Sequence, residues 1–329
     1  MFSKKETAQN RSLLTQKVRN FFVKENFLEV ETPIMTPIPG MEPHLTPFET
    51  KFKTDHQNFP LYLNTSPELQ MKKLLGAGFG NIFNITKVFR NGEIGGDTHN
   101  PEFTMIEWYR EKADYKDLMK DCEKLILSLT DSITYQGQTI DISLPWDRIS
   151  TRELFLQYCN LDLLENKTFA QFKKTADRLN YDTNACEDWD DIFFKIFLNH
   201  IEPHLGKEKP IFVYDYPSTQ AALAKKSATN PFFAERFELY IAGIELCNAF
   251  SELTDSNEQR ERLLEEQKLR KKLGKTVFPI DEEFLASLES IHYESAGIAL
   301  GLDRLFMVLL DKKSIEEVLL FPLSKLINN

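Results

Sequence analysis

Two periods in the spacing of apolar residues divide the first part of the chain into helices and strands. Apolar side chains recur at helical spacing from Thr7 to Asn26 and again from Tyr115 to Leu129, so both segments are predicted amphipathic helices. Between them, residues 81–89 and 103–109 have the short apolar runs and the alternation of strands. The loop between these two strands is rich in Gly, Asn and Asp, which predicts an antiparallel pair with a long polar connection.

The second of these strands presents two chemically different faces. Phe103, Met105, Glu107 and Tyr109 share one face, and the residues between them share the other. With Arg90 at the end of the first strand, the pair suits a site that holds an anion at one end and a cation at the other. Loops of this length are uncommon in compact domains unless they bind a ligand. A surface hairpin with a charged tip is the alternative.

The same reasoning predicts the other elements along the chain. They are strands at 27–31, 61–64, 139–144 and 211–216, a helix at 65–76, a largely helical region at 151–179, and a charged helix at 256–272. The helix at 65–76 begins with a capping hydroxyl, Pro67 and Glu68, and the prolines between residues 33 and 47 predict an extended loop. Pro203 separates His200 from His204, which argues against a metal pair on one helix.

A second hairpin is predicted at residues 237–250, with Ala242 and Gly243 at its turn. Glu238 and Glu245 lie almost symmetrically about that turn, so the hairpin should pair them across neighbouring strands on one face. Two opposed carboxylates repel unless a cation lies between them, which predicts a Mg²⁺ ion that also contacts the phosphates of a substrate. Two exposed carboxylates without a metal are the alternative.

Small residues dominate the segment at 295–305, a predicted strand that opens into a helix at 305–310. Its glycines allow a planar or phosphorylated ligand to approach the backbone closely. Arg304 lies at the start of the helix, where the helix dipole disfavours a structural cation and favours a bound anion. Arg304 is therefore predicted to bind an anion together with backbone N–H groups.

Composition narrows the class of protein. The 329 residues include 40 Lys and Arg against 50 Asp and Glu, and a formal net charge of −10 argues against broad nonspecific binding of nucleic acid. The four cysteines form no CxxC pair, which favours free thiols in a reducing cytoplasm and argues against a zinc site. Because no signal-peptide core and no apolar run of roughly 18 residues occurs, we expect a cytoplasmic protein without membrane association.

Three stretches together resemble the signature motifs of class II aminoacyl-tRNA synthetases. Residues 27–33 (FLEVETP) resemble the first motif, Arg90 with residues 99–104 (HNPEFT) the second, and residues 297–305 the third. No GxxxxGK[ST] phosphate loop occurs, as expected for this family. The resemblance implies an α+β fold, the class II catalytic core, in which a mixed, mostly antiparallel sheet is flanked by helices. It also implies a single catalytic domain over residues 1–329 and a homodimer.

Residues 105–109 (MIEWY) and 243–255 are similar to the lysine-specific subclass. Because no OB-type anticodon-binding domain precedes the first helix, the chain resembles the free-standing paralogues that attach (R)-β-lysine to a lysine of translation elongation factor P. Ser66 stands where the tRNA enzymes usually have Ala, and Ala299 where they have Gly. Ala249 replaces a family Gly, and the second-motif loop at 95–98, which begins with Gly95, departs from the family in length.

The resemblance implies ATP-dependent activation of (R)-β-lysine as an adenylate, followed by transfer to the acceptor lysine. It implies an ATP site made of Arg90, Asn91, Glu93, His99, Asn100, Phe103, Glu245, Leu246, Gly301 and Arg304. It implies an amino-acid site made of Ser66, Pro67, Glu68, Glu107, Tyr109, Asn248, Glu252 and Ala299. Arg90 and Arg304 would be catalytic through the ATP phosphates, and Glu238 and Glu245 would bind Mg²⁺.

Two other functions fit parts of the sequence. A truncated lysyl-tRNA synthetase conflicts with the acidic net charge and with Ser66 and Ala299. A catalytically inactive regulatory paralogue conflicts with the retained arginines and acids of the motifs. We expect no tRNA substrate, and we expect a local basic strip of Lys72, Lys73 and residues 270–272 to guide the acceptor protein.

Overall fold

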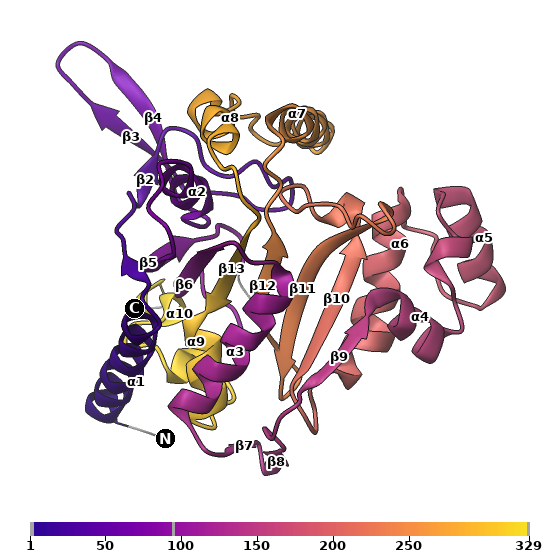
Figure 1. Cartoon of the computed structure of the whole chain (residues 1–329), viewed down its shortest axis with the longest axis horizontal. Coiled ribbons are helices and arrows are strands. Elements are labelled where there is room, and N and C mark those ends of the chain that lie inside the picture. The colour runs from indigo at the N-terminus through magenta and orange to yellow at the C-terminus, as the bar shows by residue number, and fades with distance from the viewer. Residues whose placement is uncertain (1–2, 94–95, 328–329) are drawn as a thin grey trace.

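An eight-stranded sheet organises the protein in this computed structural model, which describes residues 3–93 and 96–327 (Figure 1). In spatial order its strands are β1 (Leu28–Glu29), β5 (Ile82–Phe89), β6 (Glu102–Glu111), β13 (Ser295–Gly301), β12 (Ile244–Ser251), β11 (Phe233–Ile241), β10 (Ile211–Pro217) and β9 (Asp147–Ser150). From β5 to β10 neighbouring strands pair antiparallel, whereas each edge strand pairs parallel to its neighbour. The predicted mixed, mostly antiparallel sheet is confirmed.

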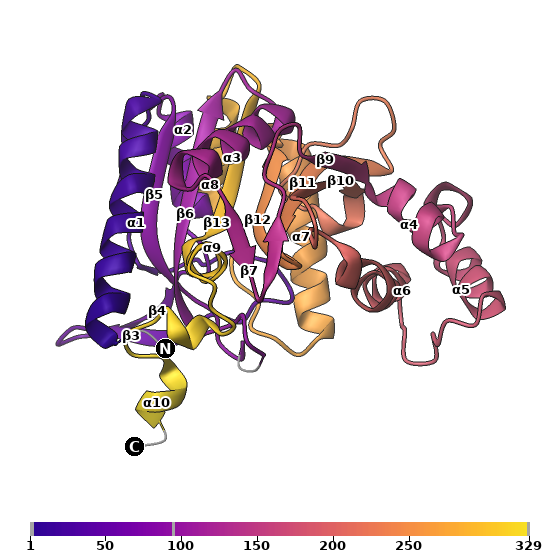
Figure 2. The same cartoon turned by 90° about the horizontal axis from the view of Figure 1, so that it is seen from below.

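Three helices cover one face of this sheet and form the main hydrophobic core with it (Figure 2). They are α1 (Lys4–Lys24), α3 (Tyr115–Leu129) and α9 (Leu302–Leu309). The helices predicted at 7–26 and 115–129 are confirmed, and each begins at a reciprocal cap, Ser3 with Glu6 and Asp114 with Asp117. Because the apolar sides of these helices pack on one face of the sheet, the strand side chains on the opposite face do not belong to this core. Those side chains can line a binding site instead.

The opposite face carries helices at one end only. They are α2 (Glu68–Gly76), α7 (Ser256–Lys272) and α8 (Glu282–Glu289), and α2 packs on α8 through a core of its own. Pro67 holds the N-cap position of α2 instead of the predicted hydroxyl residue, but the hydroxyl of Ser66 accepts from the N–H of Glu68 in the first turn at 3.4 Å. Within the described residues, no helix has the length and apolar content needed to cross a membrane.

Two small sheets lie outside the central sheet, and the strand predicted at 61–64 overlaps one strand of the first. The first comprises β2 (Met35–Thr36), β4 (Asn58–Leu63) and β3 (Glu49–Lys53), and the second comprises β7 (Ile133–Tyr135) and β8 (Gln138–Ile140). The β3–β4 hairpin projects from the body, so most of its residues are exposed and lack the half-buried alternation that reveals strands (Figure 1). The strand predicted at 139–144 ends at Ile140, because Asp141 accepts two hydrogen bonds from Ser143 in a turn.

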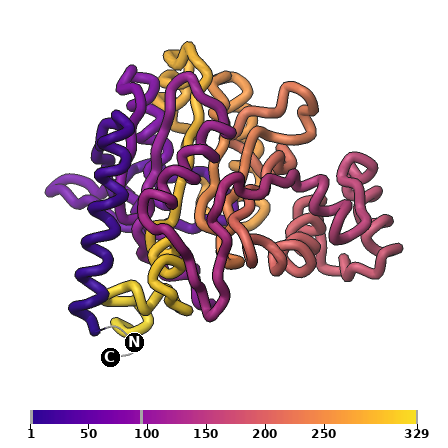
Figure 3. The backbone as a smooth tube through the Cα atoms, turned by 60° about the horizontal axis from the view of Figure 1, so that its bottom comes forward, coloured from indigo at the N-terminus to yellow at the C-terminus, as the bar shows by residue number. Residues whose placement is uncertain are grey.

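The middle of the chain forms a helical projection with a separate core at the β9–β10 edge (Figure 3). Its helices are α4 (Thr151–Cys159), α5 (Phe169–Arg178) and α6 (Trp189–Ile196), which confirms the helical region predicted at 151–179. His204 stacks on Tyr158 at 4.9 Å, and His200 contacts Tyr181 edge-on at 4.8 Å. Among the described residues no group of three or more metal-ligating side chains occurs here or elsewhere.

Candidate active site

A cavity of about 370 Å³ lies on the sheet face that points away from the main core. Phe103, Met105, Glu107 and Tyr109 of β6 all line it, as the strand pattern predicted, and Trp108 between them is buried in the core. The floor continues across β13 and β12, which lie next to β6 in the sheet. Alternation along three neighbouring strands therefore builds one face of side chains from segments far apart in the sequence.

Cationic side chains gather at one end of this cavity. Arg304, in the first turn of α9, donates to the main-chain oxygen of Glu245 at 3.0 Å and to its carboxylate at 3.2 Å. Its guanidinium also lies 2.9 Å from Nε2 of His99, whose pKa is lowered by burial and by the positive charge of Arg304. Arg90 lies over the ring of Phe103 at 5.2 Å and 3.6 Å from a carboxylate oxygen of Glu93. Two guanidinium groups at one end suit a polyanion.

Asp303, which the motif analysis missed, holds this end in place. Its buried carboxylate pairs with Arg11 of α1 at 2.5 Å and accepts the backbone N–H of Thr104 at 2.7 Å. These contacts join α1, β6 and the first turn of α9, the turn that carries Arg304. The available signal in the sequence was an acid directly before a predicted anion-binding arginine. The partners of that acid could not be predicted, because they come from distant segments.

Carboxylates gather at the opposite end of the cavity. Glu107 and Glu252 are 2% and 3% exposed, and an oxygen of Glu107 has no hydrogen-bond partner among the described residues. Burial, and then the charge of Glu68, raise the pKa of Glu107 well above its usual value, while its other oxygen accepts from the Tyr109 hydroxyl at 3.1 Å. A side chain at Gly297 would collide with Tyr109 and Glu252, so glycine there lets the two converge. A buried carboxylate without a partner is stabilised when a cation binds beside it.

Lys72 of α2 is a buried ammonium between two of these carboxylates, whereas the sequence analysis assigned it to a surface strip. Its Nζ lies 2.7 Å from Glu68 and 2.7 Å from Glu252, and 4.9 Å from the ring centre of Phe250. The side chain is 1% exposed. Burial alone would lower the pKa of Lys72, but Glu252 and Glu68 together raise it above the usual value, so the group stays charged.

Ala299 lies at the centre of the floor between these carboxylates and β12. On β13 it pairs with Glu107 on one side and with Asn248 on the other, so its methyl group points into the cavity that both line. Asn248 accepts a hydrogen bond from Arg236 at 2.7 Å. Ser66, Glu68, Leu246 and Gly301 also line the cavity, as do the other predicted residues already placed there.

The direct pairing predicted for Glu238 and Glu245 is wrong. A bulge between Leu239 and Tyr240 shifts the register, so Glu238 pairs with Asn248 and Glu245 pairs with Tyr240. One oxygen of Glu238 accepts from the hydroxyls of Tyr216 and Tyr240, and the other accepts from Arg236 at 2.6 Å. The two carboxylates still influence each other, because Glu245 adds to the effect of burial in raising the pKa of Glu238.

These contacts decide which residues suit a divalent cation. Mg²⁺ is usually held by one or two carboxylates together with substrate phosphates. Glu245 fits that role, because its carboxylate lines the cavity beside Arg304. Glu238 does not line the cavity, and a metal there would require its tyrosine and arginine donors to release it.

Several other predicted residues lie away from the cavity or serve the fold. Asn91 and Pro67 do not line it, and Gly95 lies outside the described residues. Asn100 does line it, but its side chain bonds the backbone of Glu102 and of Leu323. Glu252 lies behind the wall, beside Tyr109 and Lys72.

The predicted basic strip is wrong for two of its members. Lys72 is buried in the carboxylate cluster, and Arg270 is 1% exposed with its guanidinium bonded to the carbonyl oxygens of Glu42 and Thr276. Lys73 pairs with Asp281 at 2.8 Å. Of the strip, only residues 271 and 272 are exposed.

Comparison with known proteins places nearly the whole chain in one family. The sequence profile of tRNA synthetases class II (D, K and N) matches residues 3–325. A Haemophilus influenzae protein named elongation factor P–(R)-β-lysine ligase is 40% identical over 313 residues, which cover 94% of this chain and 93% of that protein. Proteins of the same name from Proteus mirabilis and Salmonella typhi are each 39% identical over 95% and 96% of this chain, and 93% and 94% of theirs.

Proposed function

The chain belongs to the class II tRNA synthetases of the D, K and N group, and we propose that it is an ATP-dependent ligase that joins (R)-β-lysine to a lysine of translation elongation factor P. One observation carries the proposal beyond the shared names. A single cavity has two arginines at one end and buried carboxylates at the other. That polarity suits the phosphates of ATP at one end and the ammonium groups of a diamino acid at the other. The reacting carboxylate of the amino acid then lies between them.

Activation requires the substrate carboxylate to attack the α-phosphorus of ATP. The nucleophile is already ionised, so the protein contributes positioning and charge neutralisation, with no general base. Arg90 holds the α-phosphate and Arg304 the γ-phosphate, where departing pyrophosphate gains negative charge. Phe103 stacks on the base, and His99, neutral beside Arg304, completes the wall around the phosphates. Glu245 would hold Mg²⁺, which would supply further neutralisation at the phosphates, and the predicted contribution of Glu238 stays a prediction.

Charge balance explains why the amino-acid end suits a diamino acid. Glu68, Glu107 and Glu252 carry three negative charges when ionised, and Lys72 neutralises one of them. The remaining two match the two ammonium groups of a lysine isomer. We propose that Glu107, Tyr109 and Glu252 bind the ε-ammonium and that Glu68 binds the amine near the carboxylate, with Ser66 and Asn248 beside it.

The partners follow from the same proposal. Apolar side chains of α1, β1 and the segment at 34–35 are exposed along the β1 edge of the sheet, which supports a homodimer through that edge; they are Leu13, Val23, Leu28, Ile34 and Met35. We propose one catalytic domain, because the family profile matches residues 3–325 without a break. The four cysteines are free thiols, which favours the reducing cytoplasm as the place of reaction.

ATP–pyrophosphate exchange followed by mass measurement tests this function. We expect exchange that depends on (R)-β-lysine more than on α-lysine, and a mass increase of one β-lysyl group on purified elongation factor P. Bulk tRNA should remain uncharged, since the chain carries ten more acids than bases. Efficient charging of tRNA, with no mass change on elongation factor P, would instead identify a lysyl-tRNA synthetase.

Replacing Ala299 with glycine is expected to shift substrate preference towards α-lysine. The methyl group lies between Glu107 and Asn248 on the cavity floor, where its removal makes room for an amine on the carbon next to the carboxylate. Discrimination by one methyl group is worth about 1–3 kcal/mol, or roughly a 5- to 150-fold change in relative kcat/KM. Exchange rates for both lysines measure this, and an unchanged ratio would remove Ala299 from the specificity site.

The Michaelis constant for (R)-β-lysine is expected to fall as pH rises from 6 to 8. Burial raises the pKa of Glu252 to about 7, opposed by the positive charge of Lys72. Because the substrate ammonium needs the ionised carboxylate, the competent fraction should rise about tenfold over that range. Exchange assays at saturating ATP measure the effect, and Glu252→Gln should flatten the profile. A KM for β-lysine that does not vary with pH would contradict this role.

A further inference from the structure

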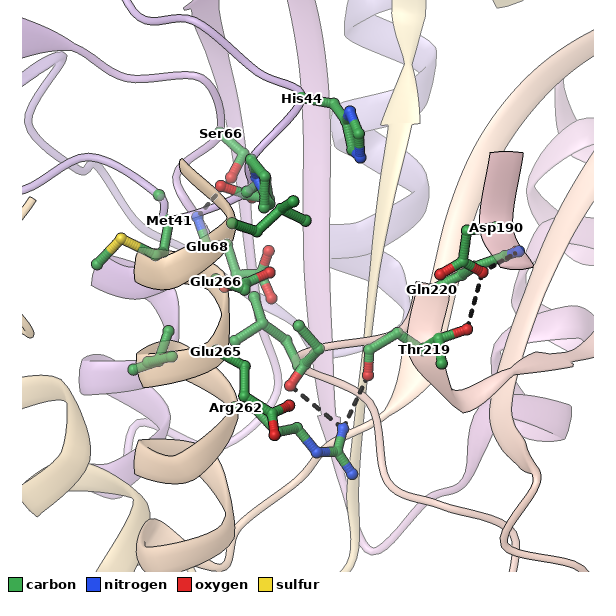
Figure 4. A pocket seen from close by; sticks show the side chains of 18 of the residues that line it. Met41, His44, Ser66, Glu68, Asp190, Thr219, Gln220, Arg262, Glu265 and Glu266 are labelled. Carbon is green, nitrogen blue, oxygen red and sulfur yellow. Dashed lines mark hydrogen bonds between the residues drawn. The ribbon is translucent and has the colours of Figure 1, made fainter. Parts of the chain in front are cut away.

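A second cavity, of about 820 Å³, opens between α7, the loop at 38–44 and η4 (Ser218–Gln220) (Figure 4). It meets the candidate site at the amino-acid end, because both cavities are lined by Glu42, Ser66, Glu68, Arg236, Asn248 and Phe250. Arg90 and Arg304 line only the smaller cavity. A second reactant can therefore reach the amino-acid end through the larger cavity while a nucleotide occupies the phosphate end.

Hydrogen bonds within its walls keep the larger cavity open. Arg262 of α7 donates to the carbonyl oxygens of Ala221 at 2.8 Å and Ala224 at 2.7 Å, which ties the helix to the loop after η4. On the other side, Asp190 accepts from Thr219 at 2.8 Å and from Gln220 at 2.9 Å (Figure 4). The volume falls within the range of roughly 300–1,000 Å³ typical of ligand cavities, and it exceeds what one side chain fills.

The chemistry of the walls suits a lysine side chain. Leu69, Leu263 and Phe250 provide apolar surface for an aliphatic stem. Glu266 of α7 has no hydrogen bond or ion pair among the described residues, and Figure 4 shows it on the same side of the cavity as Glu68. Oε2 of Glu42, at the junction of the two cavities, is also buried without a partner among the described residues. Unpaired carboxylates beside an apolar channel are complementary to an ammonium group on a long stem.

We propose that the larger cavity receives the lysine-bearing loop of the acceptor protein and that Glu266 accepts the proton of its ammonium group. This inference rests on the proposed ligase function and assigns the second half of that reaction. Burial raises the pKa of Glu266 to about 8; Glu42 and Glu68 add to the shift, and Arg270 and Arg262 oppose it. A carboxylate of that basicity is better matched to an ammonium proton than an ordinary glutamate is.

The transfer step balances with the groups named. The acceptor ammonium gives one proton to Glu266, and the neutral amine nitrogen then forms a bond to the acyl carbon of the adenylate. The bond between that carbon and the phosphate oxygen breaks, and AMP leaves with the electron pair. The second amine proton passes to the departing phosphate, so the products are an amide, AMP and a protonated Glu266. Glu266 returns to its ionised form by releasing the proton to solvent.

A comparison of two nucleophiles tests this assignment. β-Lysyl-adenylate is formed on the enzyme and then mixed either with elongation factor P or with hydroxylamine, which is uncharged at neutral pH and needs no base. For Glu266→Gln we expect transfer to the protein to slow at least tenfold, while exchange and hydroxylamine capture stay at the wild-type rate. Glu266→Asp should recover part of the rate. Glu261→Gln is the matched control, because Glu261 is exposed on the same helix and does not line the cavity.

Each contrary outcome is distinct. Protein transfer at the wild-type rate in Glu266→Gln would overturn the assignment. An equal loss with both nucleophiles would show a structural effect and would overturn it too. A raised KM for β-lysine with unchanged transfer would make the cavity an entrance for the small substrate instead. Absence of exchange in the unmodified enzyme would count against the proposed function itself, before the transfer step is reached.

Discussion

Replacing Arg304 with alanine is expected to lower ATP–pyrophosphate exchange about 10²-fold or more while leaving the fold intact. The side chain is 22% exposed in the cavity, and its partners are the carboxylate and main-chain oxygen of Glu245, the main-chain oxygen of Thr98 and the ring of His99. None of these groups is a buried charge that depends on the guanidinium as its counter-ion, so the free energy of unfolding should change little. Losing one preorganised charge at a phosphate should remove about 2.7–4 kcal/mol of transition-state stabilisation. Exchange rates and urea unfolding measured on the same preparation separate the two effects.

A matched arginine controls for the loss of a guanidinium in general. Arg152 makes a bidentate contact with Asp162 at 2.8 and 2.6 Å, but it lies on the helical projection and does not line the candidate site. Arg152→Ala should leave exchange unchanged. If Arg304→Ala retains exchange near the wild-type rate, the third motif does not bind the phosphates, and the assignment of the cationic end fails.

Replacing Lys72 with methionine is expected to destabilise the protein by about 3–5 kcal/mol at pH 8. The substitution keeps the volume of the stem but leaves the buried carboxylate of Glu252, and that of Glu68, without a counter-charge. Glu252 already has its pKa raised by burial, and without Lys72 that pKa should rise further. A carboxyl whose folded pKa lies above its unfolded pKa loses stability as pH rises. The destabilisation should therefore be smaller at pH 6 than at pH 8, as measured by urea unfolding at both values.

The neighbouring lysine provides the control for this experiment. Lys73 pairs with Asp281 and Glu283, and its side chain is 22% exposed, so Lys73→Met should cost about 1 kcal/mol or less. Adding Glu252→Gln to Lys72→Met should recover much of the lost stability, because the fully buried carboxylate is then neutral and only Glu68, whose side chain is 15% exposed, still lacks its counter-charge. Equal, small effects of the two lysine substitutions would show that Lys72 does not neutralise the amino-acid end.

Local sequence patterns were sufficient for most of the fold and for the faces of the central strands. The alternation in β6 separated Glu107 and Tyr109 from Trp108, and the structure places the first two in the cavity and the third in the core. Periodicity likewise located α1 and α3. These features depend on side chains within one turn or one strand, so a single segment contains the information. In the exposed β3–β4 hairpin only the end of β4 was predicted, as a strand at 61–64, and β3, which lacks such a pattern, was missed.

Which charged groups meet was decided by the tertiary structure alone. Lys72 has the pattern of a surface lysine on an amphipathic helix, yet the packing of α2 against the sheet brings it to Glu252, the residue that follows β12. The register of β11 and β12 depends on a bulge at Leu239 and Tyr240, and no residue in the turn predicts that bulge. The bulge places Glu238 opposite Asn248 and not opposite Glu245. Asp303 of α9 likewise pairs with Arg11 of α1, a distant segment that packs on the same face of the sheet. The sequence by itself determined which side chains could bind phosphate or ammonium; their pairing required contacts between distant segments, because a buried charge is stabilised by whichever partner the folded chain brings within hydrogen-bonding distance.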